Sequence, residues 1–319
     1  RTDTPWYPSA QLFRQSEAGD WRDVLTEVED ALRSDAGPVA MLVSDPSLGG
    51  QPSARSDSED ASIALLVQQG LMAHQLNQLD EAKSLYEQVL AKDSANVSAL
   101  ELLGLIHFSQ CNYEQALYYY LEAVQKNPSN PIIHHNIGNV LADLGRLEEA
   151  IFSFDTCLTL DPNNAEVYKN KANALYELHC FESALEAYDQ VLSLGLDDPS
   201  VYATRGAVLS KLDRDEEALA NYGIAESKGN LSAQGYHNLG GVLGSLGCID
   251  AALDSYNRAI SLRSDYQSAH WNKALLLLLR GEYLEGWSLY EWRSKGDDAP
   301  VKFPSFSQPS WRGEFDISG

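Results

Sequence analysis

The chain has 319 residues, of which 44% are hydrophobic, 9% aromatic and 22% charged. This apolar fraction is enough for a continuous core, so a wholly disordered chain is excluded. The formal net charge of −23 is opposite in sign to the charge that binding to nucleic acid or to anionic membranes requires. The longest apolar run, residues 274–279, is too short to span a bilayer, and no signal peptide begins the chain. We therefore expect a folded, cytoplasmic protein that binds neither nucleic acid nor membranes.

The first predicted element is an amphipathic helix within residues 1–35. Asp20 is a favourable N-cap, and apolar residues recur at helical spacing from Trp21 to Leu32. Residues 36–60 follow, with three prolines, three glycines and five serines, a composition typical of a flexible linker. The apolar face of the helix needs a surface to pack on, so we expect another domain before the linker.

From residue 63 the sequence repeats every 34 residues, without insertion, over seven units that end at residue 300. Each unit has Gly or Ala at positions 8 and 20 and an aromatic residue at position 24. The small residues allow two helices, A and B, to approach closely, and the aromatic fills the gap between helix B and helix A of the next unit. The pattern resembles the tetratricopeptide repeat (TPR) family. The resemblance implies an all-α, right-handed superhelical solenoid of seven helix pairs over residues 61–300.

In this family helix A lines the concave groove, at positions 2, 5, 6, 9, 12 and 13, and asparagine recurs at two of these positions. The asparagines are Asn136, Asn170, Asn238 and Asn272 at position 6, and Asn139 and Asn173 at position 9. An amide both donates and accepts, so such a row can bind the backbone of an extended peptide. The row resembles the asparagine ladder of O-linked N-acetylglucosamine transferases, although Gln68, Leu102 and Thr204 interrupt it. A row of solvated polar residues without a ligand is the other interpretation, and both stay open.

A second groove site known in this family is a clamp of basic residues for the terminal carboxylate of a chaperone. Lys169 and Asn173 match its first two residues, and Lys169 therefore joins the candidate peptide-binding residues. The next repeats supply Thr204, Gln234 and Asn238 in place of the basic residues, so the charge that would hold a carboxylate is missing. We reject the clamp.

The last repeat differs from the others and places an apolar patch on its groove face. The patch consists of Trp271, Leu275, Leu278 and Leu279. A patch of this kind is unfavourable in water, so we predict that residues 283–311 fold back over it. The remaining tail, residues 301–319, is predicted to be extended.

Both ends of the chain resemble parts of bacterial glycosyltransferases that are fused to TPR repeats. The segment TPWYPSAQLFRQ at residues 4–15, with GDW at 19–21, resembles the end of such an enzyme domain. The segments GEYLEGWSLYEWR at 281–293 and FSQPSWRGE at 306–314 resemble the junction from the last repeat into a catalytic region. The resemblance implies that this chain is the repeat segment of a longer glycosyltransferase, covalently linked to catalytic domains on both sides.

The chain itself carries no catalytic or metal-binding motif. Its four cysteines and seven histidines show no zinc-ligand spacing, and no phosphate loop or nucleophile motif is present. We expect no catalysis, cofactor or metal, and we predict a protein-protein interaction scaffold that binds an extended polypeptide in the groove. The alternative is a stand-alone TPR adaptor that recruits a basic partner protein.

Overall fold

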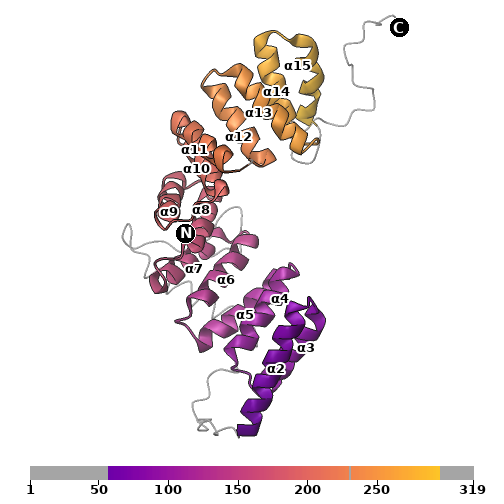
Figure 1. Ribbon diagram of the computed structural model, residues 1–319, viewed down its shortest axis with the longest axis vertical. Helices are drawn as coiled ribbons and strands as arrows, with labels where there is room; N and C mark the ends of the chain where they lie inside the picture. Colours follow the sequence, from indigo (N-terminus) through magenta and orange to yellow (C-terminus); the bar gives the residue numbers. More distant parts are fainter. Residues whose placement is uncertain (1–56, 230, 295–319) are drawn as a thin grey trace, which may run out of the picture. The chain divides into compact units, whose positions relative to one another are not determined.

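The computed structural model of the protein describes residues 57–229 and 231–294. These residues form fourteen α-helices and one 3-10 helix, and no strand occurs among them. The helices are α2 (Asp57–Gln75), α3 (Leu79–Lys92), α4 (Val97–Ser109), α5 (Tyr113–Lys126), α6 (Pro131–Asp143), α7 (Leu147–Leu160), α8 (Ala165–Glu177), α9 (Phe181–Ser193), α10 (Pro199–Lys211), α11 (Asp215–Lys228), α12 (Ala233–Ser245), α13 (Ile249–Leu262), α14 (Gln267–Arg280), α15 (Tyr283–Tyr290) and η2 (Glu291–Ser294). They follow one another as seven A–B pairs, from α2 with α3 to α14 with α15 (Figure 1), which confirms the predicted all-α fold.

The chain divides into two units, Arg1–Asp60 and Ala61–Gly319. The predicted helix within residues 1–35, most of the linker and the tail at 301–319 lie outside the described residues. Residues 57–60, which the sequence assigned to the linker, instead begin α2. Their sequence, DSED, suits a first helical turn because acidic residues are favoured at the positive end of the helix dipole. None of the helices described is long and apolar enough to cross a membrane.

Side-chain caps set the start of helix A in repeats two to six. In each of these repeats the N-cap side chain accepts a hydrogen bond from a backbone N–H two or three residues further on. The caps are Asn96, Asn130, Asn164, Asp198 and Ser232. A cap at the same place in successive repeats fixes where each helix A begins, and so fixes which of its residues face the groove.

Every helix A is followed, at position 15, by a residue with left-handed backbone. Glycine occupies this position in three repeats, whereas Asn77, Cys111, His179 and Asp213 occupy it in the others, the first two with φ of 58°. The next N–H then bonds a carbonyl five residues earlier, as in Arg146 N to Leu141 O at 2.8 Å. This turn directs helix B back along helix A.

The aromatic ring at position 24 lies directly on the small residue at position 8 of its own repeat. A Cβ built on Gly104 would lie 2.7 Å from Cε1 of Tyr120, and one on Gly240 would lie 2.7 Å from Cε1 of Tyr256. The Tyr120 ring is 1% exposed and also packs in one cluster with residues of the next repeat. The ring therefore joins the two helices of its own repeat in addition to filling the predicted gap between repeats.

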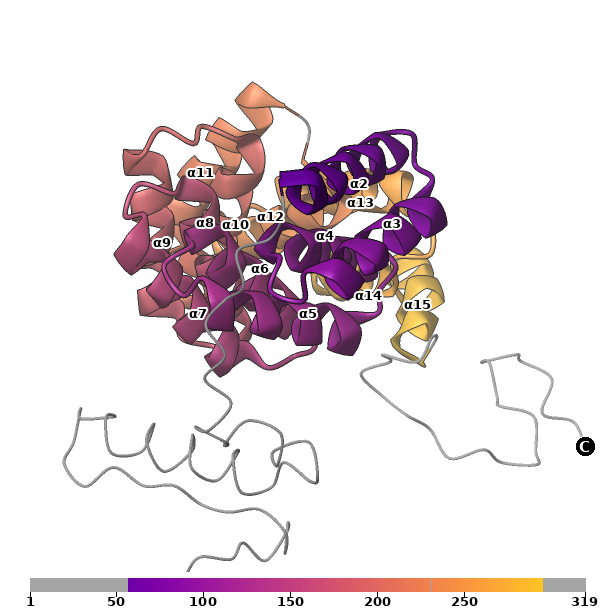
Figure 2. The ribbon, with the colours of Figure 1, turned by 90° about the horizontal axis from the view of Figure 1, so that it is seen from below.

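Successive repeats stack by packing helix B on helix A of the next repeat, and neighbouring A helices such as α6 and α8 also contact each other. In Figure 2, α6 and α8 lie toward the inside of the stack, and α7 and α9 lie outside them. Equivalent positions of consecutive A helices are thereby brought side by side.

The start of the segment predicted to fold back over the last repeat covers only part of the apolar patch. Residues 283–290 form α15, the regular helix B of repeat seven, and η2 follows to Ser294. Leu275 and Leu279 are exposed, by 41% and 75%, whereas Trp271 and Leu278 are partly buried. The repeat register persists because Gly286 at position 20 is buried against Leu278. Residues 295–311 lie outside the described residues.

We predict that Gly104→Ala destabilises the protein, because the added Cβ has to displace a buried ring that cannot move into solvent. Overpacking of this kind costs about 1–3 kcal/mol, which exceeds the gain in helix propensity. The measurement is the midpoint of urea unfolding followed by circular dichroism.

Gly223→Ala is the matched control for this substitution. Gly223 lies within α11, is exposed, and an added Cβ would meet no atom within 4 Å. The control should be as stable as the native protein or more so, by up to about 1 kcal/mol. Equal effects of the two substitutions would show that the ring contact does not limit position 8.

Candidate peptide-binding groove

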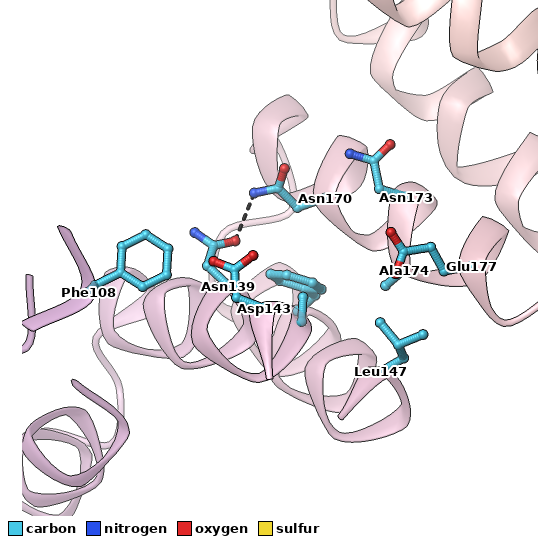
Figure 3. Close-up of a pocket in the computed structure, with 10 residues that line it drawn as sticks. Phe108, Asn139, Asp143, Leu147, Asn170, Asn173, Ala174 and Glu177 are labelled. Carbon is cyan, nitrogen blue, oxygen red and sulfur yellow. Dashed lines mark hydrogen bonds between the residues drawn. The ribbon is translucent and has the colours of Figure 1, made fainter. Parts of the chain in front are cut away.

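The structure gathers three of the seven candidate peptide-binding residues in one pocket. Asn139 comes from α6, and Asn170 and Asn173 come from α8. The pocket has a volume of about 270 Å³ and lies across repeats two to four. Its lining residues come from α4, α6, α7 and α8 and are Phe108, Asn139, Ala142, Asp143, Leu147, Phe154, Asn170, Asn173, Ala174 and Glu177. Figure 3 shows the three amides beside the carboxylates of Asp143 and Glu177.

Contacts within the protein fix the direction of the Asn170 amide. Its Nδ2 donates to Oδ1 of Asn139 at 2.9 Å (Figure 3) and to Nε2 of His135 at 3.0 Å. Both amide hydrogens are thus used, and the carbonyl oxygen remains as an acceptor. The His135 ring accepts through Nε2, so its proton is on Nδ1, and burial lowers the pKa of this imidazole although nearby Glu166 opposes the effect.

The amides of Asn139 and Asn173 have the opposite orientation. Oδ1 of Asn139 accepts from Asn170, and Oδ1 of Asn173 accepts from the hydroxyl of Tyr188. Burial raises the pKa of Tyr188 to about 12, so the hydroxyl keeps its proton and can donate. No described residue accepts a hydrogen bond from either NH2 group. Along the pocket, the unused NH2 groups of Asn139 and Asn173 therefore lie on either side of the unused carbonyl oxygen of Asn170.

The contact between His135 and Asn170 recurs three repeats later. Nδ2 of Asn272 lies 3.0 Å from Nε2 of His237, again joining position 6 of one repeat to position 5 of the repeat before it. Nδ1 of His237 lies 3.3 Å from Oδ1 of Asn238, and burial is the main cause that lowers the pKa of His237. Both pairs link neighbouring A helices through a neutral imidazole.

The other candidate residues lie away from the pocket. Asn238 accepts from Nε2 of Gln234 at 2.8 Å on its own helix. Lys169 forms an ion pair with Glu166 one turn earlier, which neutralises its charge. Asn136 is partly buried and has no hydrogen-bond partner among the described residues. The predicted row is thus made of residues with different local partners, and its role in binding stays a prediction.

The sequence interpretation missed two kinds of residue in the groove. It noted only that the histidines lack zinc-ligand spacing, yet His at position 5 followed 35 residues later by Asn at position 6 occurs at both pairs. It assigned position 13 to the groove but proposed no binding role for Asp143 and Glu177, which stand there one repeat apart and line the same pocket. In both cases the spacing of these residues in the sequence, at one repeat or one repeat plus one residue, could have predicted that they lie close together.

Family models for the tetratricopeptide repeat match residues 68–131, 119–152, 138–179 and 233–266. The matched segments are similar to tetratricopeptide repeats, and the seven helix pairs show the fold of this repeat. The segments that resemble glycosyltransferase fusions lie outside the matched ranges, at residues 4–15, 19–21, 281–293 and 306–314.

Several solved structures share the TPR fold of this chain. PilF of Pseudomonas aeruginosa is 20% identical, with a TM-score of 0.59 over 68% of this chain and 99% of its own. A tetratricopeptide repeat protein of Parabacteroides merdae is 17% identical, with a TM-score of 0.49 over 81% of this chain and 93% of its own. YrrB, a TPR protein with an unusual peptide-binding site, is 20% identical, with a TM-score of 0.46 over 54% of this chain and 89% of its own. No curated protein is significantly similar in sequence.

The partly buried imidazoles of His135 and His237, and the buried imidazole of His107, predict a loss of stability in mild acid. Burial lowers all three pKa values below 6.5, the value of a free imidazole, so the unfolded chain takes up protons at a pH where the folded protein does not. The free energy of unfolding is therefore highest above about pH 6.5 and decreases as the pH falls below it. We expect a lower Tm at about pH 5.5 than at about pH 7.5.

His135→Gln should reduce this pH dependence, because glutamine keeps an acceptor for Asn170 and cannot be protonated. His179→Asn is the control, since His179 is exposed and asparagine tolerates its left-handed backbone. The change in Tm between the two pH values should be smaller in His135→Gln and unchanged in the control. An unchanged difference in both variants would show that His135 does not cause the effect.

Proposed function

We propose that the repeats bind an extended segment of a partner protein, and that the pocket of repeats two to four holds its backbone. The observation that carries this proposal is the alternation of unused hydrogen-bonding groups on Asn139, Asn170 and Asn173. An extended peptide presents N–H and C=O groups in alternation, so its acceptors suit the two NH2 groups and one of its donors suits the Asn170 oxygen. No catalytic role is part of this proposal.

Amide side chains that are already fixed favour binding, because they lose little further conformational entropy when the peptide binds. Asn170 is held by two partners and Asn173 by the Tyr188 hydroxyl, so their side-chain entropy is already lost in the free protein.

The test compares amides inside and outside the pocket. Peptides that bind the protein are first selected from an array of random 12-residue peptides, and their affinities are then measured by fluorescence anisotropy. Asn139→Ala with Asn173→Ala removes two donors at about 1 kcal/mol each, so Kd should rise roughly thirtyfold.

Asn136→Ala is the matched control, because Asn136 lies on the same helix as Asn139 but outside the pocket. Its Kd should stay within about twofold of the native value. An unchanged affinity in the double variant would contradict the proposal, and an equal loss in the control would favour the full asparagine row over the pocket. Circular dichroism checks that each variant keeps its helices.

We further propose that the repeats belong to a longer glycosyltransferase and present its polypeptide acceptor in the cytoplasm. The support is the resemblance of residues 4–21 and 281–314 to TPR fusions of this class. The cytoplasm is supported by the free thiols, three of which are exposed, because such thiols are typical of a reducing compartment.

Sequencing the gene outward from the codons for Arg1 and Gly319 tests this second proposal. We expect α/β domains with nucleotide-sugar sites on both sides. A start codon shortly before Arg1 and a stop codon shortly after Gly319 would contradict it and leave a stand-alone adaptor.

A further inference from the structure

The pocket contains two carboxylates that no basic residue of the described chain neutralises. Asp143 and Glu177 occupy position 13 of consecutive A helices, and both are exposed. Neither forms an ion pair with a described residue, whereas nearby acids do, as Glu166 with Lys169 and Asp155 with Lys171. The negative charge of the pocket is thus available to a ligand.

Apolar and aromatic groups share the pocket with these carboxylates. The side chains of Ala142, Leu147 and Ala174 lie along it, and the Phe108 ring stands at its other side from Glu177 (Figure 3). Apolar walls suit the aliphatic stem of a long side chain, and an aromatic ring together with carboxylates suits its cationic end. A divalent metal ion fits less well, because no group of three or more His, Cys, Asp or Glu in the described part of the chain could hold one.

We propose that this pocket binds one arginine side chain of the polypeptide in the groove. The guanidinium would lie at the carboxylates of Asp143 and Glu177, and its stem would lie along Ala142 and Leu147. Arginine is favoured over lysine because its planar group can donate to two carboxylates at once and can stack on an aromatic ring. The inference rests on the proposed function and specifies its ligand: the amides hold the backbone and the carboxylates select the residue.

The test uses five pools of 12-residue peptides with random flanks and one fixed central residue: arginine, lysine, citrulline, norleucine or glutamate. Citrulline keeps the shape of arginine without its charge, so it separates the charge from the shape. Binding to the native protein is measured by fluorescence anisotropy at about 150 mM salt, where exposed charges more than about 8 Å apart are screened. The arginine pool should bind about tenfold more tightly than the citrulline pool.

Asp143→Asn with Glu177→Gln should abolish this preference. The matched control is Glu148→Gln with Glu182→Gln, which removes the same charge from position 18 of the same two repeats, outside the pocket. The control should keep the tenfold preference. All four residues are exposed, so neither double variant should affect folding.

The outcomes separate this inference from the proposed function. If no pool binds the native protein, the proposed function fails and the inference fails with it. If all pools bind without preference for arginine, or if the control loses the preference as completely as the pocket variant, only the inference fails. Loss of the preference in the pocket variant alone supports it.

Discussion

Each repeat depends on an aromatic ring that packs on a residue with little or no side chain. Tyr120 on Gly104 is one example, and Tyr256 on Gly240 is another. The contact fixes the distance between helices A and B, because the buried ring has no room to shift. The same ring reaches the next repeat, so the placement of neighbouring A helices follows from it. The side-by-side arrangement of groove residues is therefore a consequence of core packing.

Core packing also sets the direction of the groove amides. The buried Tyr188 hydroxyl turns the Asn173 oxygen inward, which leaves the NH2 group for the pocket. In the same way, Asn139 and His135 take both hydrogens of Asn170. These polar residues thus stabilise contacts within a repeat, as Asn173 does, or between repeats, as Asn170 does, and leave their other groups unused by the described residues. A buried donor or acceptor that lacks a hydrogen bond destabilises the folded protein, which explains why these groups are paired with one another.

The repeat period was sufficient to predict the helix pairs and the small residues on which they pack. It was not sufficient to predict where each amide points, because rotating an amide by 180° exchanges donor and acceptor without changing the register. That choice depends on partners such as His135, which lies 35 residues away from Asn170. The end of α14 shows a related limit: the apolar residues there indicated a cover, but the repeat register continued through α15.

The pocket coincides with one difference between repeats. Position 24 is tyrosine in every repeat except the third, which has Phe154, and Phe154 lines the pocket. In repeats four and six the tyrosine hydroxyl hydrogen-bonds to position 6 of the next repeat: Tyr188 with Thr204, and Tyr256 with Asn272. Burial raises the pKa of both tyrosines, and these hydrogen bonds partly offset the rise. Phe154 offers Asn170 no hydroxyl, and the Nδ2 group of Asn170 donates to Asn139 and His135. The missing hydroxyl therefore distinguishes this place in the groove from the corresponding places in repeats four and six.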